Sequence, residues 1–184
     1  MPRVLVYGFG PYRHFKENIT AKILKGLPSR DNLRTVIFPV RFQRKQFTEA
    51  LKKHRPDVVL GLGQSSRRRI EIETVARNRR RDDPRGLARP IRARGPRMLP
   101  TTLDLRPGRA LGRSRDAGNY VCNYSMYVIL DEIERRGLDA RFGFIHVPYS
   151  YELSKAARLI GQALNRLTRR YGESSRKRLV TSCY

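Results

Sequence analysis

The chain has 184 residues, of which 39% are hydrophobic and 30% are charged, a composition typical of one folded domain and not of a disordered chain. No apolar run is long enough to cross a membrane, and the short apolar stretch at the N-terminus does not have the pattern of a signal peptide. The two cysteines, Cys122 and Cys183, exclude a disulfide framework and favour a reducing compartment, so we expect a cytoplasmic protein with no membrane partner.

The charge is strongly positive: 40 Lys and Arg residues stand against 16 Asp and Glu residues, which gives a net charge of +24. The acids are too few to neutralise the bases in ion-pair networks, and a surface of this sign attracts polyanions such as RNA, or an acidic partner. Because no aromatic-basic interleaving or binding motif accompanies the charge, weak nucleic-acid or polyanion association is an alternative hypothesis and not the leading one.

In chain order, the first half alternates between strand patterns and helix patterns. Strands are predicted at residues 3–7, 36–40 and 57–62, of which the first and the last are apolar enough to be buried, and helices at residues 42–54 and in a segment capped by Asn18 or Thr20 that runs through Leu27. The pair Gly8 and Gly10 does not make a dinucleotide-binding loop, because a third glycine is absent and Pro11 interrupts the pattern. The stretch from Gly61 to Gln64 predicts a turn after a strand's carboxyl end, where open α/β sheets build their sites.

The second half begins with strand alternation over residues 69–76, which puts Ile70 and Ile72 on one face and Glu71 and Glu73 on the other. Residues 79–100 are rich in proline and arginine and show no periodicity, so we predict a long loop that acts as a lid or an oligomer contact. The remaining predicted elements are a short helix from Pro107 through Leu111, a helix from Cys122 to Arg136, a strand at residues 141–147 and a helix at residues 151–171.

This order of elements predicts a single α/β domain, an α/β/α sandwich in which helices flank a mostly parallel twisted sheet. We expect the domain to span residues 1–171 and to be followed by a basic C-terminal tail, residues 172–184, that frays. No internal repeat or linker divides the chain.

The stretch from Asp116 to Asn123 is where we expect the chemistry to centre. A glycine-containing turn precedes Cys122 and an amphipathic run follows it, which predicts that Cys122 lies in the first turn of a helix. Unpaired backbone N–H groups and the helix dipole stabilise a thiolate at such a place, and the thiolate is the nucleophilic form. The alternative is a small buried cysteine that only packs, and for a lone cysteine the two interpretations carry about equal weight.

A nucleophilic cysteine needs a base and a group that orients the base. Of the three histidines, His54 is expected to be exposed at a helix end, His14 lies in a loop, and His146 ends an apolar strand, where α/β proteins gather catalytic groups. A histidine in an apolar strand can also be a core residue, and either Glu71 or Glu73 can supply the orienting carboxylate. The residues by themselves suggest a Cys-His-carboxylate hydrolase without fixing its members.

Four segments carry motifs that follow one another in a recognisable order. They are Gly8 to Tyr12 with Asn18, Pro56 to Gln64 leading to Glu73 to Asn78, Asp116 to Asn123 with Met126 and Tyr127, and Gly143 to Tyr149. This ordered set, which reaches up to the last predicted helix, resembles pyroglutamyl peptidase I (pyrrolidone carboxyl peptidase), a family of cysteine peptidases.

The resemblance implies an omega-peptidase that removes N-terminal pyroglutamyl residues through a thioester acyl-enzyme, with neither a metal nor a cofactor. It implies a triad of Cys122 as nucleophile, His146 as base and Glu73, in preference to Glu71, as the residue that orients the imidazole. It also implies that N-terminally blocked peptides are the partners, and that the chain forms a homo-oligomer, as family members often do.

The resemblance also assigns the substrate pocket to Phe9 and Tyr12, with Asn18 and Gln64 holding the pocket or its loops by hydrogen bonds. Without the resemblance, core packing and turn capping would be the simpler interpretations of these residues. An aromatic, dry pocket would accept the uncharged pyroglutamyl lactam and reject an ordinary N-terminal ammonium, whose burial is costly.

The chain departs from the family pattern around these motifs. Asn18 is followed by Ile19-Thr20 where Pro-Ser is usual, Tyr12 stands where Phe is usual, and Ser65 to Arg69 replaces a small, glycine-containing stretch. An intact triad in altered surroundings predicts a divergent member that keeps catalysis. A related hydrolase with changed specificity is therefore a further alternative.

Overall fold

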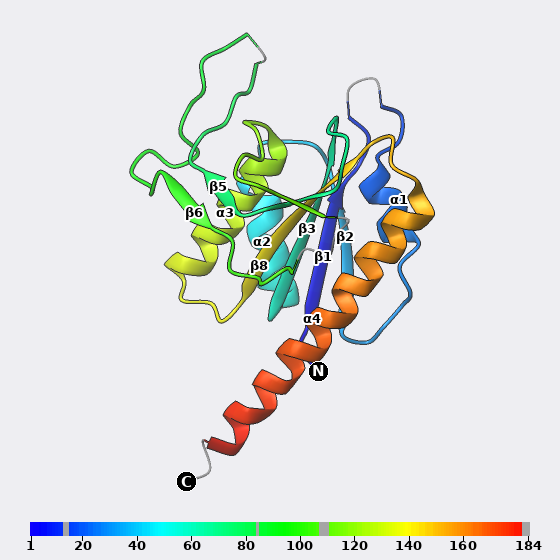
Figure 1. The fold of residues 1–184 in the computed structure, drawn as a ribbon. Coiled ribbons are helices and arrows are strands. Elements are labelled where there is room, and N and C mark those ends of the chain that lie inside the picture. Colours follow the sequence, from blue (N-terminus) through cyan, green and yellow to red (C-terminus); the bar gives the residue numbers. More distant parts are fainter. Residues whose placement is uncertain (13–14, 84, 107–110, 182–184) are drawn as a thin grey trace.

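The computed structural model describes residues 1–12, 15–83, 85–106 and 111–181, with side chains described as far as residue 172. The strands are β1 (Val4–Phe9), β2 (Leu33–Phe38), β3 (Val58–Ser65), β4 (Glu71–Glu73), β5 (Val75–Arg77), β6 (Met98–Pro100), β7 (Gly112–Ser114) and β8 (Arg141–Pro148). The helices are α1 (Ile19–Lys25), α2 (Arg44–His54), α3 (Val121–Arg135) and α4 (Leu153–Thr181). Figure 1 shows the main sheet, whose strand order over these residues is β2-β1-β3-β8-β4-β7.

The long strands of this sheet run parallel to one another. β1 pairs with β2 and β3, and β3 pairs with β8 from Val58 opposite Arg141 to Ser65 opposite Pro148. The short β4 is antiparallel to β8 and puts Glu73 opposite Phe144. β1 is buried along its whole length and β3 and β8 along most of theirs, which is why their sequences are continuous apolar runs.

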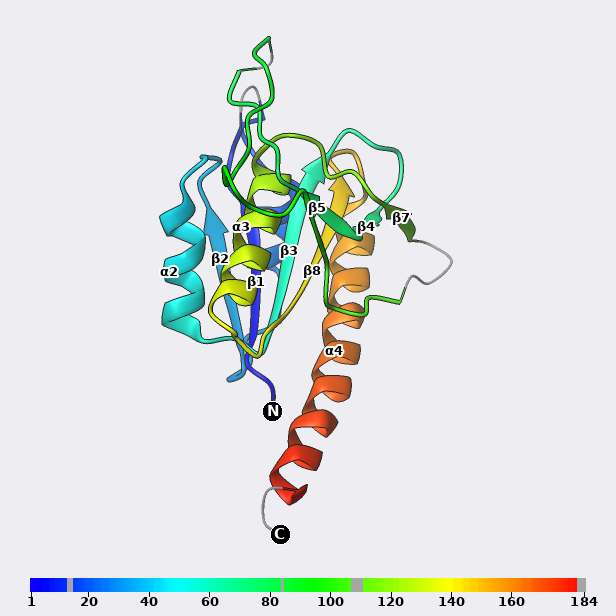
Figure 2. The same cartoon turned by 90° about the vertical axis from the view of Figure 1, so that its left-hand side faces the viewer.

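Helices cover both faces of the sheet, and Figure 2 shows α2 and α3 on one side and α4 on the other. α1 packs with α4 in the second layer. From β1, Leu5 and Tyr7 enter the core beneath α2 and α3, whereas Val4 and Val6 enter the core beneath α1 and α4. Alternate side chains of one strand thus serve the two cores, and the predicted α/β/α sandwich is confirmed.

The carboxyl ends of β1, β3 and β8 meet at one edge because these strands are parallel. α1 begins at this edge with Asn18 as its N-cap, since the Asn18 side chain accepts a hydrogen bond from the Thr20 amide at 3.0 Å. α3 begins here too, with Cys122 beside Gly63 of β3. This edge therefore brings together residues from all four of the predicted motif segments.

Gly61 to Gln64 form the second half of β3 and not the turn that the sequence predicts. A Cβ atom at Gly61 would come within 2.6 Å of the Tyr7 ring and 2.4 Å of the Phe144 ring. Large side chains on the two neighbouring strands occupy the space that a side chain at this position would need. The glycines therefore mark close packing inside the sheet rather than a break in it.

Other elements also differ from their predicted limits. The strand predicted at residues 69–76 divides into β4, in the main sheet, and β5, which belongs to a second sheet with β6, and the strand predicted at residues 36–40 is β2 at residues 33–38. The long segment after Asn78 does not remain a loop to its end, because β6 at residues 98–100 pairs with β5. α4 does not end at Tyr171 but continues to Thr181, past the end of the sheet in Figure 1, through a stretch without proline that is rich in helix-forming residues. Within the described ranges, no helix is both long and apolar enough to cross a membrane.

Some predictions fall on residues outside the described ranges. Most of the short helix predicted from Pro107 belongs to them, and the chain that follows it forms the edge strand β7. His14 and Cys183 also lie outside the described residues.

Candidate active site

A cavity of about 250 Å³ opens at the carboxyl edge of the sheet. Its walls come from the segment after β1, the end of β3, the start of α3 and the end of β8. The predicted site residues that line it are Phe9, Tyr12, Asn18, Gln64, Cys122 and His146. Residues far apart in the sequence therefore meet around one space that is large enough for a small ring.

Cys122 is the second residue of α3 and is partly exposed to this cavity. The N-cap residue, Tyr120, has an extended backbone and its side chain makes no capping hydrogen bond, so amides of the first turn remain for another acceptor. The turn before the helix has Gly118 at φ +80°, a conformation that glycine adopts without strain, and its amide donates to Asp116 Oδ1 at 3.0 Å. The predicted position of Cys122 in the first turn is confirmed.

His146 and Glu73 form a buried pair next to Cys122. His146 Nδ1 lies 2.7 Å from Glu73 Oε1, and the two side chains are 6% and 0% exposed. β4 runs antiparallel to β8 with Glu73 opposite Phe144, so the Glu73 carboxylate reaches the imidazole diagonally, two residues along β8. With Nδ1 engaged by the carboxylate, Nε2 is the nitrogen left for proton transfer.

Gly63 allows Cys122 and His146 to lie side by side. A Cβ atom at this position would be 2.8 Å from Cys122 Sγ and 2.8 Å from His146 Cδ2, the ring carbon bonded to Nε2. Any side chain here would therefore push the sulfur and the imidazole away from their positions. Gly63, which the sequence assigns to a turn, therefore lies in β3 directly beside the Cys122 and His146 side chains.

The pKa values of this pair follow from their surroundings. Burial lowers the pKa of His146, but the charge on Cys122 and the hydrogen bonds to Cys122 and Glu73 outweigh burial and raise the pKa to about 9. Burial raises the pKa of Glu73, but the hydrogen bond and charge of His146 outweigh it and keep this pKa below its usual value. Imidazolium and carboxylate are therefore the favoured forms of this pair at neutral pH.

The structure separates the other candidates from this pair. The Glu71 carboxylate pairs with Arg67 and Arg69, and it is Glu73 whose carboxylate reaches His146. His54 ends α2 and is half-buried, not fully exposed as expected, and it does not line the cavity. Among the described residues, no cluster of three His, Cys, Asp or Glu side chains could hold a metal ion.

The predicted pocket residues fall into two groups. Phe9 and Tyr12 present rings to the cavity, and the Tyr12 ring lies 5.0 Å from the ring of Tyr120. Asn18 donates from Nδ2 to the Gly10 carbonyl at 3.1 Å, and Gln64 Oε1 accepts from the Ile19 amide at 2.9 Å. The two amide side chains thus fix the segment between β1 and α1, which carries Tyr12 and directly follows Phe9.

Several lining residues were not predicted. They are Phe15, Val40, Ser65, Ser66, Ala117, Tyr120, Val121 and Tyr149. Tyr120 and Tyr149 stand inside the motif segments next to Cys122 and His146, and that closeness is the signal that could have found them. Tyr149 is 51% exposed and its ring lies 5.3 Å from that of Phe15, so the two rings border the cavity.

Two asparagines fix the backbone around the site. Asn123, fully buried in the first turn of α3, donates to the carbonyls of Arg77 and Arg79 at 2.8 Å and accepts from the Arg77 amide at 2.8 Å. Asn78 binds the amides of Ile91 and Arg92 with its oxygen. These bonds tie the start of α3 to β5 and tie the long segment after Asn78 to the residue that follows β5. β5 itself begins two residues after Glu73 in the chain.

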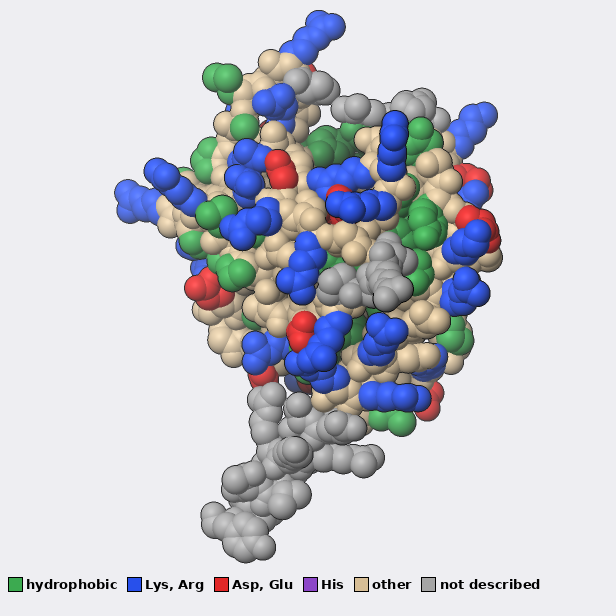
Figure 3. All heavy atoms as spheres, in the orientation of Figure 1, with side chains coloured by type: hydrophobic (Ala, Val, Ile, Leu, Met, Phe, Trp, Pro, Cys, Tyr) green, Lys and Arg blue, Asp and Glu red, His purple; other side chains and the backbone are tan. Residues whose placement is uncertain are grey.

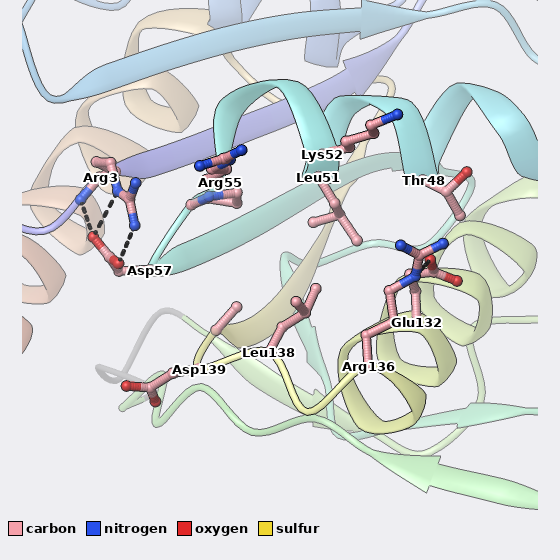
Figure 4. A pocket seen from close by; sticks show the side chains of 12 residues that line it. Arg3, Thr48, Leu51, Lys52, Arg55, Asp57, Glu132, Arg136, Leu138 and Asp139 are labelled. Carbon is pink, nitrogen blue, oxygen red and sulfur yellow. Dashed lines mark hydrogen bonds and ion pairs between the residues drawn. The ribbon is translucent and has the colours of Figure 1, made fainter.

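A second cavity, of about 340 Å³, lies at the opposite edge of the sheet. Figure 4 shows Leu51 and Leu138 facing it, and Arg3 and Asp57 joined by hydrogen bonds at its rim. The Arg3 and Asp57 side chains are 58% and 37% exposed. This cavity has charged groups at its border but no nucleophile paired with a base.

Comparison with known proteins gives a consistent result. The sequence profile of the pyroglutamyl peptidase family matches residues 2–89 and 107–159. The pyrrolidone-carboxylate peptidase of Halalkalibacterium halodurans is 34% identical over 174 residues, which cover 82% of this chain and 86% of the relative. That of Thermococcus kodakarensis is 33% identical over 170 residues, which cover 82% of each chain.

Solved structures agree with the sequence comparison. Pyrrolidone carboxyl peptidase from Thermococcus litoralis superposes with a TM-score of 0.83 at 24% identity, over 95% of this chain and 96% of that one, which shows a shared fold. Pyroglutamyl peptidase I of Bacillus amyloliquefaciens gives a TM-score of 0.80 at 26% identity, over 89% of this chain and 95% of that one.

Proposed function

Because the chain belongs to the pyroglutamyl peptidase family, a family of cysteine peptidases, we propose that it removes N-terminal pyroglutamyl residues from peptides with Cys122 as nucleophile. His146 is the general base and acid, and Glu73 orients its imidazole. The observation that carries this proposal is the buried 2.7 Å contact of Glu73 Oε1 with His146 Nδ1, beside a cysteine in the first turn of a helix.

The chemistry is acyl transfer in two steps. The Cys122 thiolate attacks the carbonyl carbon that joins the pyroglutamyl ring to the next residue, and the carbonyl oxygen becomes an oxyanion that amides of the first turn of α3 can bind. The C–N bond then breaks, protonated His146 gives its proton to the leaving amine, and a pyroglutamyl thioester remains. Water, deprotonated by His146, attacks the thioester, releases pyroglutamate and restores the thiolate beside imidazolium.

Substrate choice follows from the aromatic walls. The pyroglutamyl lactam carries no charge, so it can leave water for a cavity bordered by Phe9, Tyr12 and Tyr120 at low cost. An ordinary N-terminal ammonium would lose its hydration there without gaining a partner charge. In this proposal Asn18 and Gln64 keep the aromatic segment in place, in line with their bonds to Gly10 and Ile19.

A change of specificity is the second candidate, and one observation favours it. Ser65 and Ser66, which stand where the family has a small, glycine-containing stretch, line the cavity beside Gln64. Their hydroxyls add polar groups to the part of the wall next to the amide of Gln64. A blocked or acidic N-terminus other than pyroglutamate would then be the preferred substrate.

The basic surface supports a weak polyanion association alongside catalysis. On the face in Figure 3, Lys and Arg side chains are spread widely among few acidic ones and do not gather in one groove. Such a surface binds RNA through charge and not through sequence, so binding would weaken steeply with salt and persist in Cys122→Ala.

A cytoplasmic location, a homo-oligomer and a lid role for residues 79–97 are further parts of this proposal.

The proposal is tested with fluorogenic amides in a reducing buffer of moderately high salt. We expect the wild type to release the amine from a pyroglutamyl amide, and Cys122→Ala to release none. The matched prolyl amide keeps the five-membered ring but carries a charged amine, and we expect no release from it. An enzyme that does not turn over the pyroglutamyl amide while Cys122 still reacts with iodoacetamide would favour changed specificity, and turnover by Cys122→Ala would overturn the assignment of the nucleophile.

A further inference from the structure

Arg67, in the loop between β3 and β4, has a guanidinium that reaches three groups. Nη1 donates to Glu73 Oε1 at 2.9 Å and to the Glu71 carboxylate, and Nη2 donates to the backbone carbonyl of Asp116. The Arg67 side chain is 34% exposed and does not line the substrate cavity. Its contacts therefore run to the groups behind the site and not to the substrate.

The Glu73 carboxylate is the centre of these contacts. Its Oε1 accepts from Arg67 and lies 2.7 Å from His146 Nδ1, so a permanent cation and a titrating one share a single oxygen. The charged, titratable and polar groups that surround the Glu73 carboxylate are Arg67, Glu71 and Arg69 from β4 and the loop before it, Ser114 from β7 and His146 from β8. Cys122 from α3 lies beyond His146.

The charge of Arg67 matters most when His146 is neutral. In the proposed hydrolysis, His146 gives up its proton to the leaving amine and later takes one from water, whereas the guanidinium stays charged throughout. Glu73 is completely buried, and a buried carboxylate that loses its cationic partner tends to take up a proton. With Arg67 bonded to it, Glu73 can stay ionised in both states of His146.

The second arm of Arg67 reaches the segment that carries the nucleophile. Asp116 begins the turn through Gly118 into α3, and its carboxylate accepts from the Gly118 amide and pairs with Arg79 at 3.0 Å. The Arg67 fork binds the main-chain carbonyl of the same residue. Because a guanidinium is planar and rigid, its two nitrogens hold the Glu73 carboxylate and the Asp116 carbonyl at a fixed separation.

We propose that Arg67 is a positioning residue for the hydrolysis, which joins the carboxylate that orients the base to the turn that presents the nucleophile. This inference rests on the proposed function for the roles of Glu73, His146 and Cys122. It adds a permanent cation as a fourth member of the unit.

The test compares Arg67→Met and Arg67→Lys with Arg69→Met as the matched control, because Arg69 pairs with Glu71 but not with Glu73. For Arg67→Met we expect kcat on a pyroglutamyl amide to fall about tenfold or more, with KM nearly unchanged. The acidic limb of the pH–rate profile should move to higher pH, because loss of the Arg67 charge raises the pKa of Glu73. Arg67→Lys keeps one charge and should restore the limb but only part of kcat, and Arg69→Met should match the wild type.

A substrate-free readout separates this inference from the proposed function. Alkylation of Cys122 by iodoacetamide at mildly acidic pH should slow in Arg67→Met and not in Arg69→Met, whether or not the pyroglutamyl amide is the right substrate. Wild-type alkylation and an unshifted pH profile in folded Arg67→Met would overturn the inference. If Arg67→Met does not fold, Arg67→Lys decides. A wild-type kcat in Arg67→Lys would contradict the proposal that Arg67 binds the Glu73 carboxylate and the Asp116 carbonyl at once. A lowered kcat with an acidic limb at its wild-type position would support that proposal.

Discussion

The cavities at the two ends of the sheet differ in what their charged groups can do. At the amino end, Arg3 and Asp57 pair at the surface, where water screens their charges. At the carboxyl end, Glu73 and His146 pair out of contact with water, and Cys122 lies against the imidazole. The amino-end cavity is the larger, about 340 Å³ against about 250 Å³, so size does not identify the site.

The difference follows from the direction of the strands. In a parallel sheet the carboxyl ends of β1, β3 and β8 deliver their following segments to one edge, and helix α3 points its first turn at the same edge. The opposite edge receives helix ends and the short connections into the strands. Burial then decides the rest, because a low-dielectric surrounding shifts the pKa of a group whereas a screened surface pair shifts it little.

The largest expected effect comes from removing either reactive group. Cys122→Ser and His146→Ala should each lower kcat/KM for the pyroglutamyl amide by about 10⁴-fold or more, because neither variant can form the thiolate–imidazolium pair. Lys52→Ala, at the border of the amino-end cavity, should stay near wild type in the same assay. Near-wild-type activity in Cys122→Ser or His146→Ala would contradict the proposal that the carboxyl-end cavity, and not the amino-end cavity, is the active site.

A smaller loss is expected when the orienting carboxylate is neutralised. Glu73→Gln keeps the shape of the side chain, so we expect a residual activity, lowered by about 10²- to 10⁴-fold. The negative charge of Glu73 favours the imidazolium, so its removal should lower the pKa of His146 from about 9 and move the alkaline limb of the pH–rate profile to lower pH. An alkaline limb at its wild-type position would show that Glu73 does not act on His146.

A side chain added at Gly63 should lower the activity by a still smaller factor. Gly63→Ala places a methyl group 2.8 Å from both Cys122 Sγ and His146 Cδ2, and displacement of the reacting groups should lower kcat by about 10²-fold. Gly161→Ala on α4 is the control, because apart from its chain neighbours and the nearby backbone of its own helix nothing lies within 4 Å of the added Cβ. Equal activity of the two variants would mean that the close approach at Gly63 is unimportant.

The smallest effect is expected at the amino end and is a change in stability alone. Burial raises the pKa of Asp57, but the hydrogen bonds from Arg3 outweigh burial and lower it. A lowered pKa contributes stability above the unfolded-state value, and that contribution is lost as the pH falls through the folded-state value. Arg3→Met should lower the unfolding free energy by at most about 1 kcal/mol at pH 7, less in acid, with unchanged activity. Thermal melts of the wild type and of Arg3→Met at pH 7 and in acid measure this difference in stability.

The sequence predicts the parts of the molecule whose signal is local. The apolar runs of β1 and β8 and the stripe of Phe47, Ala50 and Leu51 on α2 lie where expected. The turn before Cys122 likewise marks the start of α3. Each of these patterns depends on near neighbours in the chain, so composition and spacing suffice.

The parts that could not be predicted depend on pairing between distant segments. Alternation puts Glu71 and Glu73 on one face of a strand, and the register with β8 even sets Glu71 directly opposite His146. Only the side-chain arrangement in the folded protein, with Glu73 completely buried against the imidazole, shows which carboxylate reaches His146. The resemblance to a family made that choice, and the residues alone did not. Gly63 was assigned to a turn because nothing local reveals that Cys122 and His146 would occupy the space above it.

The central claim, that Cys122 attacks the substrate carbonyl, is tested most directly by trapping the thioester. An activated pyroglutamyl ester acylates fast, so the acyl-enzyme should accumulate, and acid quench followed by mass spectrometry would locate it. We predict one pyroglutamyl group on the peptide that contains Cys122 in the wild type and none in Cys122→Ala. A pyroglutamyl group on another residue, or wild-type turnover of the ester by Cys122→Ala, would contradict the account.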